Sequence, residues 1–468
     1  MGEHNNIGRR VLGLLDGKAL FEPNNSASSL TFAAAGGGKT TCVAMPTIMS
    51  LLGDKNRALM INDVKNGEIT HQIADMCIKY GRKFAAVDDA YVMGADYPYR
   101  ISLNAFGSSI TTAKQAPEYL GFVSENQSYA LIEEPSGNDA KNFYFRDVPR
   151  KMFIELGQRV LINRSERLCT PGGLTALLND PQTWVSALEI EAEEGDDYTR
   201  GFARHTLEMR EYNPEHYAQH LQAALSALNI YASGSVLHSS GTDATHTHEE
   251  LIRDNWVVCF VNPARYADRM GPHFALQTLA LMEAQLKGDV GKCDYILDEY
   301  CNAPLKNLLN KITIFRSLGA RAHFITQSRQ DSVRKYGERE TALLEENCTV
   351  KQWLKFSNFE EAERVSKAMG ETHARQSSLN LNSKDTNFSG GLNLGKQRLF
   401  TANELMMLPG DEQIIHVADV GFIHAKKIGQ HQIAPYAHDL APNPLEGGRL
   451  TPDIRVSLKS AMRNGRPL

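Results

Sequence analysis

The sequence predicts an α/β fold with a central, mainly parallel sheet and an inserted all-helical domain. Between residues 30 and 88, short apolar strand patterns alternate with helical patterns, an order typical of parallel strands joined by right-handed crossovers. From about residue 111 to residue 222 no strand-like run stands out, and apolar residues recur at helical spacing. Strand patterns return after residue 223 and continue to about residue 430.

Composition narrows the class of protein. The 468 residues, 42% hydrophobic and 22% charged, are typical of a soluble globular chain of several domains. No apolar run is long enough to span a membrane, and the N-terminus lacks the apolar segment of a signal peptide. The seven cysteines form no C-x-x-C pair. We therefore expect reduced thiols and a cytoplasmic location. A net charge of -5 excludes a surface that is basic throughout.

The first part of the sheet follows from local patterns. Apolar runs predict strands over 30–34, 57–64 and 83–88, and helical periodicity predicts helices over 39–52 and 68–81. Pro46 should kink the first helix because it lacks a backbone N–H.

The second part repeats this alternation. Strands are expected at 256–263, 293–300, 320–328 and 350–356, with helices at 272–288, 305–319 and 359–370. Residues 371–398 are rich in Ser, Asn and Gly, which predicts a long loop. A closing hairpin is expected over 412–428. The last twenty residues carry five basic side chains and one acid, so they form either a loose tail or a docking or nucleic-acid contact.

Residues 33–40, AAAGGGKT, approximate the phosphate-binding pattern G-x-x-x-x-G-K-[ST], with Ala33 in place of its first glycine. Three glycines allow the backbone to curl so that its amides point inward at an anion. Lys39 would bridge the β- and γ-phosphates, and Thr40 would bind magnesium. We expect the nucleotide to contact the loop residues Ala35, Gly36, Gly37, Gly38, Lys39, Thr40 and Thr41. Taken alone, the pattern also fits a plain glycine turn.

The segment YILDEY places Asp298 and Glu299 at the end of an apolar strand. Asp298 would hold magnesium either directly or through one of the ion's own ligands, and Glu299 would polarise the attacking water as the catalytic base. Alone, these acids also fit an exposed turn. The two motifs support each other because ligands of open α/β sheets bind at the C-terminal ends of strands. Gln327 ends a third strand, either as a sensor of the γ-phosphate or as an ordinary polar terminus. The predicted ligands are ATP and Mg²⁺.

The order of these motifs resembles the cytoplasmic motor of the type IV secretion coupling proteins, which pump DNA in bacterial conjugation. The matching segments are AAAGGGKTTCVAMPTIMSLL, INDVKNGEIT, YRISLNAFG with Ala105 in place of the family's proline, YILDEY, ITQS and ANELMMLPGDEQII. They span roughly residues 8 to 430.

This resemblance implies a RecA-like P-loop NTPase domain that assembles as a homo-hexameric ring. It implies that Lys39 and Thr40 bind nucleotide and magnesium, that Asp298 binds magnesium, that Glu299 is the base, and that Gln327 is the sensor. Asp63 and Lys65 would lie near the nucleotide, with their role open. The expected regions are 1–110 and 223–430 for the nucleotide-binding domain, 111–222 for the all-α insertion, and 431–468 for a C-terminal tail.

Two features of the resemblance stay open. Family members usually carry an N-terminal membrane anchor, so either an anchor was removed or the chain is a soluble relative. Such rings usually complete each site with an arginine from a neighbouring subunit. Arg316 and Arg321 are candidates, and neither is assigned.

The leading hypothesis is therefore an ATP-driven translocase that pumps single- or double-stranded DNA without sequence preference. It would act at the inner-membrane face of a bacterium with a relaxase and the secretion machinery. Three alternatives remain: a coupling ATPase that delivers protein effectors, a soluble DNA-pumping ring ATPase outside secretion, and a nucleotide-gated docking platform.

Overall fold

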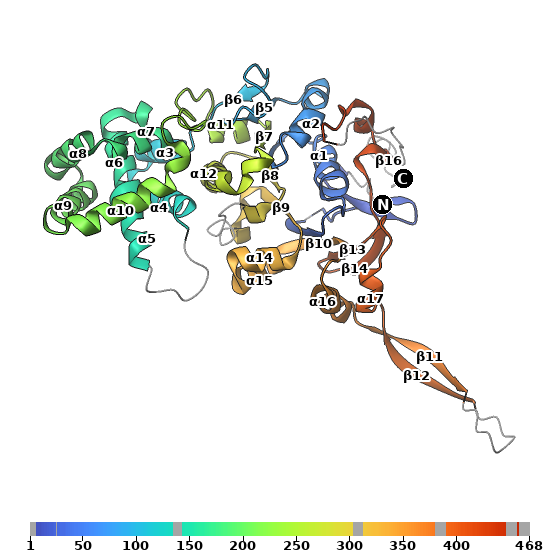
Figure 1. Ribbon diagram of the computed structural model, residues 1–468. Coiled ribbons are helices and arrows are strands. Elements are labelled where there is room, and N and C mark those ends of the chain that lie inside the picture. Colours follow the sequence, from blue (N-terminus) through green and yellow to red (C-terminus); the bar gives the residue numbers. More distant parts are fainter. Residues whose placement is uncertain are drawn as a thin grey trace.

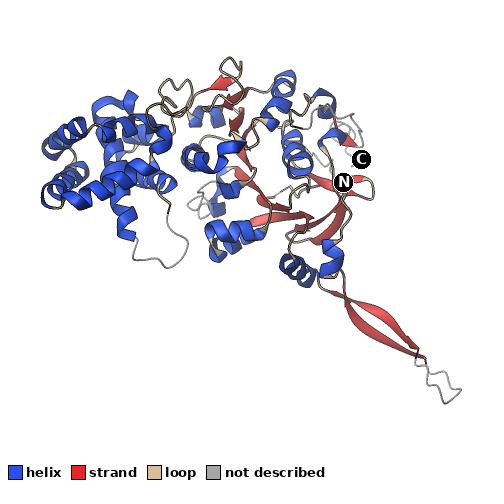
Figure 2. Cartoon of the chain, in the orientation of Figure 1, coloured by secondary structure: helices blue, strands red, loops and turns tan. Residues whose placement is uncertain are grey.

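The computed structural model describes residues 6–24, 26–133, 143–302, 312–379, 390–445 and 456–457. Within these ranges one twelve-stranded sheet runs through the molecule, with helices packed along both of its faces (Figure 1, Figure 2). The strand order is β2-β1-β14-β13-β10-β3-β9-β8-β4-β7-β5-β6.

The strands of this sheet are β1 (Val11–Leu15), β2 (Lys18–Phe21), β3 (Ser28–Ala33), β4 (Arg57–Asp63), β5 (Phe84–Val87), β6 (Arg100–Ile101), β7 (Val257–Val261), β8 (Lys292–Leu297), β9 (Ala320–Thr326), β10 (Cys348–Lys355), β13 (Glu412–Val417) and β14 (Gly421–Lys426). From β10 to β6 every neighbouring pair is parallel, which confirms the predicted parallel sheet. Every residue of β3 and β9 is buried, as expected for parallel strands covered on both faces.

The helices that cover the sheet are α1 (Met45–Leu51), α2 (Glu68–Lys79), α11 (His248–Arg253), α12 (Ala267–Leu286), α14 (Arg329–Tyr336), α15 (Glu338–Asn347), α16 (Phe359–Met369) and α17 (Ala402–Met406). Capping boxes begin two of these helices, at Thr247 for α11 and at Thr401 for α17. Of the helix expected over 305–319, residues up to 311 lie outside the described ranges, and Arg316–Leu318 form a short 3-10 turn.

A group of helices forms the end of the molecule that lies farthest from the termini (Figure 1). They are α3 (Gly107–Gln115), α4 (Leu120–Leu131), α5 (Phe143–Pro149), α6 (Leu156–Ser165), α7 (Pro171–Asn179), α8 (Pro181–Glu194), α9 (Asp197–Tyr212) and α10 (Pro214–Ala227). Side-chain oxygens of Thr170, Asp180 and Asp196 accept backbone amide hydrogens at the starts of α7, α8 and α9. The exact boundaries of 110 and 222 stay a prediction.

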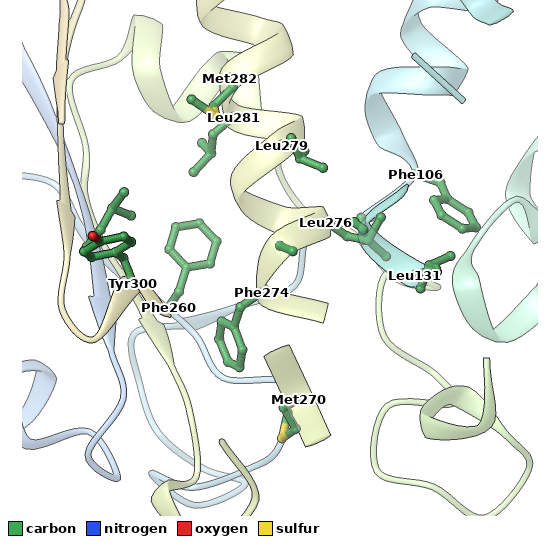
Figure 3. Close-up of a cluster of buried hydrophobic side chains, with 14 of the residues drawn as sticks. Phe106, Leu131, Phe260, Met270, Phe274, Leu276, Leu279, Leu281, Met282 and Tyr300 are labelled. Carbon is green, nitrogen blue, oxygen red and sulfur yellow. The ribbon is translucent and has the colours of Figure 1, made fainter. Parts of the chain in front are cut away.

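One hydrophobic core joins these helices to the sheet. Figure 3 shows α12 between the two, with Phe274 beside Phe260 of β7 and Leu276 on the side of Leu131 of α4. All four side chains belong to one continuous buried cluster. The all-α region is thus packed onto the sheet through α12.

Two hairpins differ from the sequence expectations. The loop predicted over 371–398 is wrong at both of its ends: β11 (Glu371–Leu379) pairs antiparallel with β12 (Gly390–Arg398), and the pair extends away from the body (Figure 1). Residues 380–389 of the predicted loop lie outside the described ranges. Its Ser, Asn and Gly content is typical of loops, but backbone pairing across the hairpin does not depend on it. At the N-terminus, β1 and β2 form an unpredicted hairpin around Asp16 and Gly17. Both turn residues have positive φ, the Asp-Gly signature of a tight turn.

The predicted hairpin of β13 and β14 is confirmed. The chain after it is packed rather than loose as far as residue 445. Tyr436 lies edge-on against Tyr80 beside α2, with ring centroids 4.7 Å apart, and Asp439 accepts a hydrogen bond from the Tyr80 hydroxyl at 2.7 Å. Short strands β15 (Ile433–Ala434) and β16 (Val456–Ser457) pair in parallel. The basic residues of the last twenty lie outside the described ranges.

The apolar helices do not resemble membrane spans. Among the described residues, no helix combines the length and the hydropathy that crossing a bilayer requires.

Candidate nucleotide-binding site

The glycine-rich loop leaves the end of β3 and needs its glycines for steric reasons. Gly36 and Gly38 have φ values of +71° and +91°, in the region that glycine tolerates best. A Cβ on Gly37 would lie 2.8 Å from the carbonyl oxygen of Ala34, which already accepts the Gly37 N–H at 2.9 Å. The three successive glycines therefore form a tight turn that larger residues could not adopt without strain.

The helix after this loop accommodates Pro46 by widening its first turn. Residues Thr40–Ala44 form a π-helical turn, in which the Met45 N–H donates to the Thr40 carbonyl oxygen, and α1 follows directly. Proline cannot donate to the carbonyl four residues before it, and a π turn is one way in which a helix absorbs such a defect. The predicted disturbance at Pro46 therefore takes the form of a π turn that carries Thr40.

The loop and the acidic strand end meet in space. Lys39 Nζ lies 2.7 Å from Glu299 Oε1, although 260 positions separate the two residues, and both side chains are largely buried. Glu299 follows β8 with a φ of +49°, which is rare for a residue with a side chain. Its backbone N–H donates to Asp298 Oδ1 at 3.1 Å. The two sequence motifs thus share one pocket at the C-terminal edge of the parallel sheet.

Asp298 is buried in this pocket, where its charge is poorly compensated. Burial raises the pKa of Asp298 to about 7; the positive charges of Lys65 and Lys39 oppose this rise, and the negative charges of Glu299 and Asp63 add to it. At neutral pH this carboxyl group is therefore poised between its two protonation states. Strongly perturbed carboxyls of this kind gather at functional sites.

The neighbouring strand β4 supplies Asp63 and Lys65. Both the backbone N–H and the hydroxyl of Thr70 donate to Asp63 Oδ2 at 2.7 Å, so this buried carboxylate fixes the start of α2. Lys65 Nζ donates to Thr40 Oγ1 at 2.8 Å. The sequence left the role of Lys65 open, and the structure places its ammonium group on the hydroxyl expected to bind magnesium.

The oxygen donors of this pocket suit a magnesium ion. The Thr40 hydroxyl and the Asp298 carboxylate are hard oxygen ligands, which Mg²⁺ prefers. One of these oxygens, Thr40 Oγ1, already accepts a hydrogen bond from a cation, the Lys65 ammonium group. The residues present therefore fit the predicted ion.

Comparison with known proteins gives a family match and a common fold. Residues 292–410 match the family described as "TraM recognition site of TraD and TraG". The chain is similar to the bacterial conjugative coupling protein TrwBdeltaN70 in its unbound form, with a TM-score of 0.62 and 14% identity over 89% of this chain and 88% of that one. No curated protein sequence matches.

Two further structures are similar. TrwB in complex with ADP and Mg²⁺ has a TM-score of 0.59 and 13% identity over 86% of this chain and 84% of that one. VirB4 of Thermoanaerobacter pseudethanolicus has a TM-score of 0.53 and 15% identity over 94% of this chain and 100% of that one. The chain resembles the type IV secretion coupling proteins.

This likeness confirms the predicted fold class, a RecA-like domain with a mainly parallel sheet and an added all-α region. The matched residues 292–410 run from β8 to just after α17. They include Asp298, Glu299 and Gln327 but not the glycine-rich loop. The coupling-protein fold is what brings the loop to these residues.

The remaining predicted residues are more exposed than Lys39 and Thr40. Ala35 and Gly36 are exposed at the top of the loop, and Thr41 is half-buried beside Cys42. Gln327 follows β9, the strand between β3 and β8, and its side chain is exposed. Its role as a sensor stays a prediction.

Of the two arginine candidates, Arg321 is excluded by its position. It lies at the start of β9, on the edge of the sheet opposite the glycine-rich loop. There it is buried, with its guanidinium 2.7 Å from both Asp294 and Glu22. An arginine held in this way cannot reach into a neighbouring subunit. Arg316 is exposed and stays a candidate.

One residue near the loop was not anticipated. Lys427, just after β14, donates from Nζ to the carbonyl oxygens of Gly37 at 3.2 Å and Gly410 at 2.8 Å. The Gly37 carbonyl and the Gly38 N–H belong to one peptide plane and point in opposite directions. By holding the carbonyl outward, Lys427 turns that N–H toward the inside of the loop. No sequence signal marks it, because the contact is made across 390 positions.

Proposed function

We propose that the chain is an ATP-driven coupling protein of a type IV secretion system, which recruits a substrate and translocates DNA as a ring-shaped motor. The observation that carries this proposal is the 2.7 Å contact between Lys39 and Glu299, because it joins the phosphate-binding loop to an acidic strand end in one buried pocket. Phosphoryl transfer needs this combination of a phosphate cradle, a cation site and a group that orients water.

The pocket suggests a division of roles. The amides of Gly36 and Gly38 would hold the phosphates, and the adjoining helix start would add its positive end. Thr40 and Asp298 would hold a magnesium ion, which when bound neutralises charge on the β- and γ-phosphates.

The ion pair of Lys39 and Glu299 suggests how nucleotide binding could free the catalytic base. While Lys39 pairs with Glu299, the carboxylate is not free to accept a proton from water. When Lys39 moves to the phosphates, Glu299 is free to accept a proton from water, whose oxygen attacks the γ-phosphorus as the bond to the β–γ bridging oxygen breaks. Nucleotide binding would thus release the base at the moment it is needed.

The comparisons support this reading. TrwB, which has the same fold, was captured with ADP and Mg²⁺. The matched family is described by its recognition of TraM, so we propose a protein of the DNA-processing complex as a partner of residues 292–410. Homo-hexamer assembly, non-specific DNA binding and a place at the inner-membrane face belong to the same proposal.

The first test is ATP hydrolysis by two pocket variants. Lys39→Ala should lower turnover at least about a hundredfold, since a preorganised charge on the reacting phosphate is lost. Glu299→Gln should bind ATP and retain it unhydrolysed. The exposed pair of Lys114 and Glu166, 2.6 Å apart in the all-α region, provides matched controls as Lys114→Ala and Glu166→Gln. Wild-type turnover in both pocket variants would refute the proposed site.

The second test separates DNA from protein cargo. ATP turnover is measured with and without single-stranded DNA at low and high salt. A DNA motor should be stimulated at low salt and lose this stimulation as salt rises, because contacts to phosphates release counterions. Protein cargo is the second candidate, which the net charge of -5 favours, and an absence of stimulation at low salt would select it.

A further inference from the structure

Lys65 occupies an unusual position for a lysine in a magnesium-binding pocket. It lies two residues after the end of β4. A turn at Asn66 and Gly67 follows it, with φ values of +56° and +77°. Its ammonium group donates to Thr40 Oγ1 at 2.8 Å. Of the nearby positive charges, that of Lys65 opposes the rise in the Asp298 pKa most strongly. The cation of this side chain therefore serves both groups that are proposed to hold magnesium.

We propose that Lys65 is a displaceable cation, which fills the magnesium position of the nucleotide-free chain and leaves when Mg²⁺ arrives with the nucleotide. This inference rests on the proposed function of the pocket. An ammonium group and a divalent ion cannot share one hydroxyl, because two positive charges at that separation repel each other strongly in a buried site. The ion would therefore have to expel Lys65.

The surroundings of Lys65 allow such a movement. Its side chain is 35% exposed, and Glu68 Oε2 lies 4.0 Å from Nζ as the next acceptor. A shift toward Glu68 would free Thr40 Oγ1 without stranding the charge. By contrast, Lys39 is 8% exposed and pairs with Glu299, whose carboxylate is not one of the proposed magnesium ligands.

The inference has a consequence for the order of binding. Mg²⁺ alone meets a Thr40 hydroxyl that already accepts the Lys65 ammonium and a Glu299 carboxylate that is already paired with Lys39, so it must displace Lys65 without help from phosphate charge. The negative phosphates of a bound nucleotide supply the charge that favours the exchange. The wild-type chain should thus bind the ion as a complex with nucleotide and only weakly on its own.

The experiment measures ion binding without nucleotide. Mn²⁺ serves as the probe, and the loss of its free-ion EPR signal reports binding. Lys65→Met and Lys65→Gln should each bind one ion at least about tenfold more tightly than the wild type, because a charge-assisted hydrogen bond no longer competes for Thr40. Lys65→Arg keeps the positive charge and should bind as weakly as the wild type. Lys18→Met, an exposed change on β2, is the surface control.

Thermal unfolding of the same samples checks that each variant is folded. Two neutral variants, Lys65→Met and Lys65→Gln, are used so that the test can still be made if one of them does not fold. Equal Mn²⁺ affinity in the wild type and both neutral variants would overturn the inference. Binding of a fluorescent ATP analogue with Mg²⁺ is measured in parallel. If the wild type binds this analogue while Mn²⁺ affinity is unchanged by the substitutions, only the Lys65 inference fails. If the wild type binds no analogue, the proposed function fails and the inference with it.

Discussion

The two ends of strand β8 each carry a buried aspartate, and the two sites differ in how their charge is balanced. At the start of the strand, Asp294 accepts hydrogen bonds from Arg57 and Arg321 at 2.7 Å and lies 2.9 Å from His323 Nε2. At the end, Asp298 accepts a hydrogen bond from the backbone N–H of Glu299 at 3.1 Å. The positive charges near it in the described part of the chain are Lys65 and Lys39, and each of these is engaged elsewhere.

The difference shows in the pKa values. Burial acts on both carboxyls and by itself would raise the pKa of each. For Asp294 the charges of Arg321 and Arg57 and the hydrogen bond of His323 outweigh burial and hold its pKa well below its usual range. For Asp298 burial wins and raises its pKa to about 7. One end of the strand is a completed ion-pair network that holds the fold, and the other keeps unbalanced charge for a ligand.

The largest effect is expected at the completed end. Asp294→Ala would leave Arg57 and Arg321 buried without their shared carboxylate and should lower the free energy of unfolding by about 3–5 kcal/mol. Denaturant unfolding measures this loss. Asp254→Ala is the control: its partner Lys83 lies 2.7 Å away, but both side chains are about half exposed, so a much smaller loss than that of Asp294→Ala is expected. Similar values for the two variants would contradict the comparison.

At the Asp298 end of the strand, removing the carboxylate is expected to raise the free energy of unfolding rather than lower it. In magnesium- and nucleotide-free buffer at pH 8, Asp298→Asn should raise the free energy of unfolding by about 2–4 kcal/mol. The folded-state pKa of Asp298 lies above its unfolded value, so the folded chain binds the proton more tightly. Stability is then greatest below about pH 4 and is lost as the pH rises through about 7.

Thermal unfolding of both chains between pH 5 and pH 8 measures this difference. The gain of Asp298→Asn over the wild type should grow across that range and be smallest at its acid end. A variant that is less stable than the wild type at pH 8 would show that Asp298 is compensated as fully as Asp294.

A smaller effect is expected for the contact behind the loop. Lys427→Ala should weaken binding of a fluorescent ATP analogue about tenfold, since two hydrogen bonds that fix the loop are lost. Lys427→Arg should recover part of the affinity. Lys426→Ala removes the adjacent lysine, which pairs with exposed Asp411 at 2.7 Å, and should bind as the wild type does. Equal affinity in Lys427→Ala and Lys426→Ala would remove Lys427 from the site.

The smallest effect probes a hydrogen bond that supports Asp294. Ser29 Oγ lies 2.9 Å from His323 Nδ1, and Ser29→Ala should lower the free energy of unfolding by about 1 kcal/mol. Thr31, on the same strand, has a buried hydroxyl with no hydrogen-bond partner among the described residues. Thr31→Val should therefore be neutral or slightly stabilising in the same denaturant titration. Equal losses would mean that the Ser29 contact contributes nothing.

Local patterns were sufficient for the parallel strands from β10 to β5 and for the two motifs, because each is written in consecutive residues, whereas the two-residue strand β6 was too short to predict. The meeting of Lys39 and Glu299 was also predictable, since parallel strands place their C-terminal ends at one edge. The roles of Asp294, Arg321 and Lys427 were not, because each depends on neighbours on other strands. The hairpin over 371–398 was missed because composition favoured a loop, whereas the Asp16–Gly17 turn carried a signal that could have been used.

The central claim is that Lys39, Glu299, Thr40 and Asp298 form one pocket that exchanges its internal ion pair for Mg²⁺ and ATP. The most direct test is a crystal structure with Mg²⁺ and a non-hydrolysable ATP analogue. We expect Lys39 Nζ on the phosphates and no longer on Glu299, with the ion between Thr40 and Asp298. A nucleotide bound elsewhere, with the Lys39–Glu299 contact intact, would contradict the account.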